Sequence, residues 1–219
     1  LQTPPAEVSA TEVRVDGQNI YELDDDEIRS IRGRKIAMVF QEPMSALNPV
    51  YTVGAQIGDV LRTNLGLNKA EARERTIELL DLVGIPSAAG RVDNYVHEFS
   101  GGMRQRVMLA MALSCDPTFL IADEPTTALD VTIQATILEL ITSMIDRFDM
   151  SLLFITHSLG VVAHACDRMG VMYASHMVEM GDMREIFKNP MHPYTVGLMN
   201  SIPRMDQQTK YLTPITGSV

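Results

Sequence analysis

The pattern of apolar and polar positions along the chain predicts short buried strands. The apolar run 119–122, bounded by Pro117 and Pro125, is typical of a strand that is buried on both faces, as in a parallel sheet. Similar runs at 35–40 and 151–156 indicate two further strands. We therefore expect a parallel sheet at the centre of the fold.

Helical patterns separate these strands. The segment 69–83 is charged on one face, has apolar residues near helical spacing and is followed by a glycine. The segment 129–148 has an apolar stripe that predicts a long helix packed on the sheet, and a further helix is expected from Ser100 to Leu113. Strands that alternate with helices indicate the α/β class.

Shorter patterns predict the remaining elements. The alternation at 12–15 before Asp16-Gly17 is typical of an edge strand and a turn, and the acidic residues 24–27 indicate the cap of a short helix. The other expected elements are strands near 168–173 and 177–180 and helices near 183–187 and 194–201.

Composition disfavours some classes of partner. The chain has 219 residues and a net charge of −10, with 18 Lys and Arg against 28 Asp and Glu, whereas a nucleic-acid surface needs clustered cations. The longest apolar run in the middle of the chain, 107–113, is too short to span a bilayer, so we expect any membrane association to come through partners. The two cysteines, Cys115 and Cys166, lack metal-ligand spacing and indicate core residues in a reduced cytoplasmic interior.

Two adjacent carboxylates, Asp123 and Glu124, follow the strand 119–122. The carboxyl ends of parallel strands are where open α/β folds place ligands. Because like charges this close repel, a divalent metal with a phosphate ligand is a favourable partner, with Asp123 held toward Mg²⁺ and Glu124 acting on a water. The alternative is a solvated acidic turn that caps the next helix.

The turn Ser100-Gly101-Gly102 opens a predicted helix. Ser100 is a suitable helix cap, and the two glycines would allow a phosphate to approach backbone N–H groups at the positive end of the helix dipole. An ordinary capped helix after a flexible turn explains the same residues.

Five motifs together resemble the ATPase subunits of ABC transporters. They are Gln41 at a strand end, "SGGMRQR" from Ser100, "FLIADEP" from Phe119, "ALD" from Ala128 and "FITH" ending at His157. The resemblance covers nearly the whole chain. It implies a Q-loop at Gln41, a signature motif from Ser100 to Gln105, a metal anchor at Asp123, a catalytic base at Glu124, a D-loop at Asp130 and a switch histidine at His157.

Elementary chemistry suits these implied roles. The neutral amide of Gln41 can reach the Mg²⁺ shell or a water without adding charge. His157 follows the strand 151–156, so we expect it at the same sheet edge as Glu124, where it can donate to a γ-phosphate. A lone histidine after a strand is otherwise more often structural.

The resemblance is closest to importers of oligopeptides, dipeptides and nickel, through "QEPMSALNPVYTVGAQI" and "NPMHPYTVGLMNSIPR". It implies a single P-loop NTPase-like domain over residues 1–219, with a helical subdomain at 44–116 and a C-terminal extension at 183–219. It also implies ATP and Mg²⁺ as cofactors, with Gln41 and Asp123 near the metal. The implied partners are a second ATPase subunit, membrane permeases and, indirectly, a solute-binding protein, at the cytoplasmic face of the membrane.

One family motif is not found in these 219 residues. The phosphate loop Gly-x-x-x-x-Gly-Lys-Ser/Thr requires a lysine after a glycine, and none of Lys35, Lys69, Lys188 and Lys210 follows one. In the resembled family this loop lies upstream, so we expect an amino-terminal truncation and a chain that is inactive alone. Two alternatives stay open: an interaction subunit that lends its signature motif to an intact partner, and a soluble ABC ATPase of repair or translation, which the acidic charge disfavours.

Overall fold

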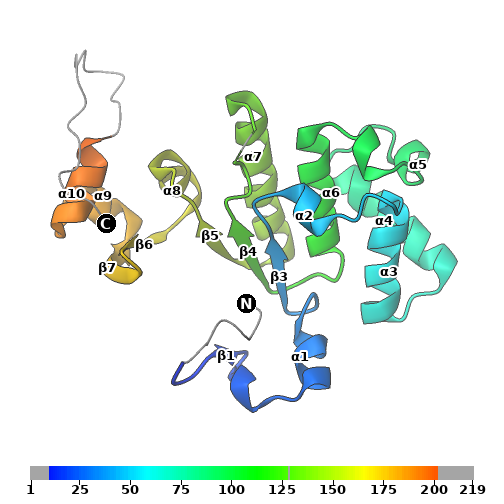
Figure 1. Cartoon of the computed structure of the whole chain (residues 1–219), viewed down its shortest axis with the longest axis horizontal. Helices are drawn as coiled ribbons and strands as arrows, with labels where there is room; N and C mark the ends of the chain where they lie inside the picture. The colour runs from blue at the N-terminus through cyan, green and yellow to red at the C-terminus, as the bar shows by residue number, and fades with distance from the viewer. Residues whose placement is uncertain (1–9, 128, 202–219) are drawn as a thin grey trace. The chain divides into compact units, whose positions relative to one another are not determined.

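The computed structural model describes residues 10–127 and 129–201 and divides the chain into two compact units, residues 1–155 and 156–219. Figure 1 shows the elements of each unit. The predicted domain boundaries stay a prediction, and residues 202–219 of the predicted C-terminal extension lie outside the described residues, as does Ala128.

The first unit contains a three-stranded parallel sheet. Its strands are β3 (Ile36–Val39), β4 (Phe119–Asp123) and β5 (Ser151–Ile155), in the order β3-β4-β5. The predicted parallel core and α/β class are confirmed. Because the strands are parallel, their carboxyl ends lie at one edge of the sheet.

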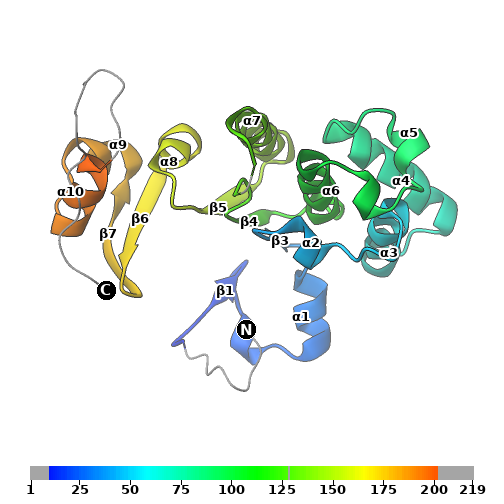
Figure 2. The same cartoon turned by 45° about the horizontal axis from the view of Figure 1, so that its top comes forward.

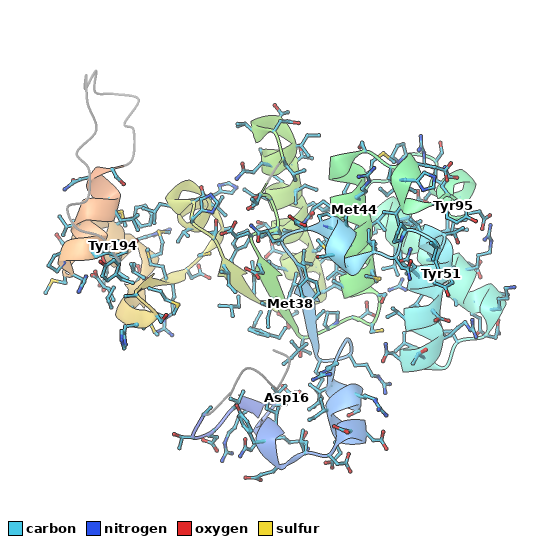
Figure 3. The ribbon with its side chains drawn as sticks, in the orientation of Figure 1. Asp16, Met38, Met44, Tyr51, Tyr95 and Tyr194 are labelled. Carbon is cyan, nitrogen blue, oxygen red and sulfur yellow. The ribbon has the colours of Figure 1, made fainter. Side chains whose placement is uncertain are left out.

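One face of this sheet is covered by two helices, α6 (Gly101–Leu113) and α7 (Val131–Phe148), as Figure 2 shows. Val39, Leu120 and Ile141 are almost fully buried in this layer. On the strands, side chains alternate between faces. Met38, Leu153 and Ile155 accordingly point away from the buried layer and are 36%, 46% and 44% exposed; Met38 is labelled in Figure 3.

In the described part of the chain, only helices and loops lie between β3 and β4. The predicted helix at 69–83 is present as α4 (Lys69–Leu82), which Asn68 and Glu71 start with a capping box. An additional helix, α3 (Val53–Leu65), begins at the cap Thr52 and ends at Gly66 in the left-handed conformation. The shorter elements here are α2 (Pro43–Ala46), α5 (Ala88–Arg91) and η2 (Val96–Glu98).

The amino-terminal part of the first unit contains the predicted strand, turn and capped helix, and in addition β2 and η1, which were not predicted. Strands β1 (Arg14–Val15) and β2 (Gln18–Asn19) form an antiparallel hairpin whose turn residues Asp16 and Gly17 both have positive φ angles. The short helix η1 (Ile20–Glu22) follows, and then α1 (Asp25–Ile31) begins with a capping box of Asp24 and Glu27.

The second unit is a hairpin with helices. Strands β6 (Arg168–Tyr173) and β7 (His176–Asp182) are antiparallel, and α9 (Met183–Lys188) packs on them through Ile186. The start of α10 (Pro193–Asn200) is tied to β7, because Glu179 accepts the backbone N–H groups of Met191 and His192 at 2.8 and 3.1 Å. Helix α8 (Leu159–Ala165) precedes the hairpin and was not predicted.

Candidate functional site

The chain makes a tight turn immediately after β4. Asp123 is the last strand residue, and the backbone N–H of Glu124 donates to Ile155 at the end of β5 (2.9 Å). Glu124 has a φ of 43°, an uncommon conformation for a residue with a side chain. The backbone N–H of Thr127 donates to the carbonyl of Glu124 at 3.1 Å, which closes a four-residue turn with Pro125 in its second position. Both carboxylates are thereby held at the carboxyl edge of the sheet.

The carboxylate of Glu124 accepts two hydrogen bonds on the same oxygen. Thr127 Oγ1 donates to Glu124 Oε2 at 2.7 Å, and Gln41 Nε2 donates to it at 3.1 Å. Gln41 lies two residues beyond the end of β3, the strand adjacent to β4. The sheet thus brings together Gln41 and Glu124, which are 83 residues apart in the sequence.

A small cavity of about 190 Å³ adjoins this pair. It lies where the loop after β3, the start of α6 and the segment after Glu124 meet. Met44, which is in α2 and is labelled in Figure 3, is one of the residues that line it. The other lining residues are Gln41, Glu42, Pro43, Gly101, Arg104, Gln105, Thr127 and Leu129.

The turn at Ser100 has the geometry of a capped helix. The hydroxyl oxygen of Ser100 accepts the backbone N–H of Met103 at 3.4 Å. Gly101 is exposed, and a Cβ built on it would find no atom nearer than Leu129 Cδ2 at 4.0 Å. Gly102 is buried, and a Cβ there would lie 2.8 Å from Ile133 Cγ2 on α7. Helix packing therefore explains Gly102, whereas the backbone at Gly101 is open to a ligand.

Gln105, one turn further along α6, is only 3% exposed. Its Nε2 atom is buried and has no hydrogen-bond partner among the residues that the structure describes. Because a buried amide without a partner is costly, this group in the cavity wall is suited to a water or a ligand atom. Its predicted contact with nucleotide stays a prediction.

The last two predicted site residues lie on either side of the boundary between the units. Asp130 is exposed and caps α7, with Oδ1 accepting the backbone N–H of Ile133 at 2.9 Å. His157 belongs to the second unit and follows Ile155, the last residue of β5, by two positions. That His157 and Glu124 act on the same phosphate stays a prediction.

The side chains at this edge fit a metal ion that takes most of its ligands from bound substrate and water. Within residues 10–127 and 129–201 there is no group of three or more His, Cys, Asp and Glu side chains that could hold a metal ion. Mg²⁺ commonly binds through one or two carboxylates, several waters and substrate phosphates. Asp123, with Gln41 nearby, suits this mode of binding.

Sequence reasoning did not find Thr127. A turn that starts at residue i places residue i+3 close to it, and a proline at i+1 favours such a turn. The "EPTT" of residues 124–127 contains that signal. The direction of the Thr127 hydroxyl, however, is visible only in the structure.

Comparisons with known proteins agree with these features. A family model described as "ABC transporter" matches residues 3–127, and one described as "Oligopeptide/dipeptide transporter, C-terminal region" matches residues 178–219. A putative peptide import ATP-binding protein of Brucella abortus (strain 2308) is 57% identical over 188 residues, which cover 86% of this chain and 56% of that protein. The dipeptide transport ATP-binding protein DppD of Bacillus subtilis (strain 168) is 51% identical over 217 residues, covering 98% of this chain and 65% of the relative.

The fold also has solved counterparts. A dimeric ATP-binding cassette in a post-hydrolysis state, bound to ADP and Pi, superposes with a TM-score of 0.68 at 28% identity. The match covers 79% of this chain and 73% of that cassette. The chain spans 56% of the length of the Brucella relative and 65% of the length of DppD. In the described part of the chain no helix is long and apolar enough to cross a membrane.

Proposed function

The chain belongs to the ABC transporter family, and from this premise we propose that it acts as the ATP-hydrolysing subunit of an importer for oligopeptides or dipeptides. The observation that carries the proposal is the pairing of Gln41 with Glu124 at the carboxyl edge of the sheet (3.1 Å). The two relatives are named for peptide import and dipeptide transport, which supports this substrate class.

The residues at this edge suit hydrolysis of a phosphate anhydride. Phosphoryl transfer needs mainly positioning and charge stabilisation from the protein. Glu124 orients a water for attack on the γ-phosphate. Asp123 would hold Mg²⁺, with Gln41 nearby, and the bound metal would supply neutralisation of the charge that develops on the phosphates. His157 donates to the γ-phosphate from the segment after β5.

The signature turn has a different task in this proposal. Ser100 and Gly101 are exposed at the start of the 13-residue helix α6, where backbone N–H groups and the helix dipole favour an anion. We propose that this surface, together with Gln105 and Asp130, faces nucleotide that is bound by a second ATPase subunit. The dimeric state of the matched cassette supports this arrangement.

Energy from hydrolysis is passed to membrane-embedded permease subunits in this proposal, and an external solute-binding protein delivers the peptide. The subunit then lies at the cytoplasmic face of the membrane as a peripheral protein. Gln41 is at once part of the site and exposed on the loop before α2, so it is suited to respond to a permease.

The test is Glu124→Gln in the natural gene product that contains these 219 residues, assembled with its permeases. We expect turnover to fall about 10²-fold or more while ATP binding is retained, because only the water-orienting carboxylate is lost. Glu139→Gln, on the exposed side of α7, is the matched control and should leave turnover unchanged. His157→Ala in the same assay should lower kcat more than it raises KM. Near-normal hydrolysis by the Glu124 variant would refute the assignment.

A further inference from the structure

We propose that Thr127 is a positioning residue that holds the carboxylate of Glu124 in its reactive orientation. The inference rests on the proposed function, because it concerns the group that orients the attacking water. Thr127 does not itself contact nucleotide in this proposal; it acts through Glu124.

The contact is short and directed. Thr127 Oγ1 lies 2.7 Å from Glu124 Oε2 in a partly buried setting. A hydrogen bond to an ionised group in such a setting is stronger than one between neutral groups. The donor thus specifies which carboxylate oxygen faces the turn, and with it the plane of the carboxylate.

The backbone holds Thr127 more firmly in place relative to Glu124 than it holds Gln41. Thr127 is tied into the same turn as Glu124 by its own N–H, which donates to the carbonyl of Glu124 at 3.1 Å. Gln41 reaches the same oxygen from an exposed loop after another strand, at 3.1 Å. If that loop shifts when a permease docks, the Gln41 contact is lost and the Thr127 contact keeps the carboxylate oriented.

The turn also explains why Glu124 needs such a donor. Its φ of 43° is held by the turn and by the bond from its N–H to Ile155 O (2.9 Å). These bonds determine the position of the backbone but leave the side-chain torsions of a glutamate to be set by contacts. The hydrogen bond from Thr127 is such a contact.

Two substitutions separate the hydroxyl from the packing. Thr127→Val keeps the branched shape and removes the donor, and Thr127→Ser keeps the donor. Because a hydrogen bond to a charged group is lost, we expect Thr127→Val to lower kcat about tenfold and to change KM for ATP much less. Thr127→Ser should restore most of kcat.

Thr136→Val is the matched control, since the Thr136 hydroxyl also donates a hydrogen bond, to Thr132 O at 2.9 Å on the exposed side of α7. ATP hydrolysis is measured in the natural gene product that contains these residues. A second measurement needs no activity: crystal structures of the variants show the side-chain torsions of Glu124. We expect the carboxylate to leave its original orientation in Thr127→Val and to keep it in Thr127→Ser and Thr136→Val.

The outcomes distinguish the two proposals. If Thr127→Val matches the unsubstituted protein in kcat and in the orientation of the Glu124 carboxylate, Thr127 has no positioning role, whatever Glu124 does. If Glu124→Gln retains turnover while Thr127→Val still changes the orientation of the Glu124 carboxylate, the hydrogen bond orients that side chain but the hydrolytic assignment of Glu124 is wrong. The positioning role is then refuted as well.

Discussion

Gly102→Ala tests whether the second glycine of the signature turn is required by helix packing. The new Cβ would lie 2.8 Å from Ile133 Cγ2 and 3.4 Å from Cδ1. Carbon atoms pack best at about 3.5–4.0 Å, so the contact with Cγ2 is about 0.7 Å too short. Because Cγ2 is attached directly to the branched Cβ of Ile133, it cannot move aside without moving the side chain or the helix.

The size of the effect follows from two opposed contributions. Overpacking of a buried contact costs about 1–3 kcal/mol, whereas alanine is favoured over glycine in a helix interior by about 1 kcal/mol and by less in the first turn. The net loss of unfolding free energy should be about 1–2 kcal/mol. For a unit of this size, that loss lowers the melting temperature by about 2–8 °C.

Urea unfolding followed by far-ultraviolet circular dichroism measures this loss. Gly101→Ala is the matched control, because a Cβ there meets nothing nearer than 4.0 Å, and its stability should be equal to or higher than that of the unsubstituted chain. In a double-mutant cycle, Gly102→Ala combined with Ile133→Ala should be less destabilised than the sum of the two single variants by about 1 kcal/mol. A Gly102→Ala variant as stable as Gly101→Ala would show that packing does not require this glycine.

Two further predictions concern ATP binding and acid stability. Since the 219 residues contain no phosphate loop, calorimetry of this chain with Mg-ATP should detect no tight binding. Micromolar affinity would show that the binding energy comes from residues other than a phosphate loop. Arg73 donates two hydrogen bonds of 2.7 Å to Asp93, and this contact lowers the pKa of the Asp93 carboxyl despite some opposing desolvation. The ion pair therefore stabilises the fold above the ordinary aspartate pKa of about 4 and ceases to do so as the pH falls through the lowered pKa. The stability difference between the original and Arg73→Met should be present at pH 7 and shrink toward pH 3, and a difference that does not change with pH would contradict the ion-pair explanation.

Local sequence determined much of the secondary structure of this protein. Strand β4 could be predicted because its apolar run is bounded by prolines, and the starts of α1 and α6 could be predicted from Asp24 and Ser100, whose side chains accept N–H groups only two or three residues away. Helix α3 was less evident because it contains two glycines, and α8 because it has only seven residues, too few for a clear period.

Tertiary structure alone decided how the site is assembled. The sequence indicates that Gln41 and Glu124 belong to the chemistry of one edge, but only the order β3-β4-β5 brings the amide within 3.1 Å of the carboxylate. The same holds for Gly102, whose need for a hydrogen atom in place of a side chain arises from Ile133 on another helix. Helix propensities and caps depend on neighbours within about one helical turn. The contacts of Gln41 and Gly102 depend instead on how distant segments pack. The sequence does not determine that packing by itself, because the free energy of burial is not directional and many side-chain pairings satisfy the same apolar pattern.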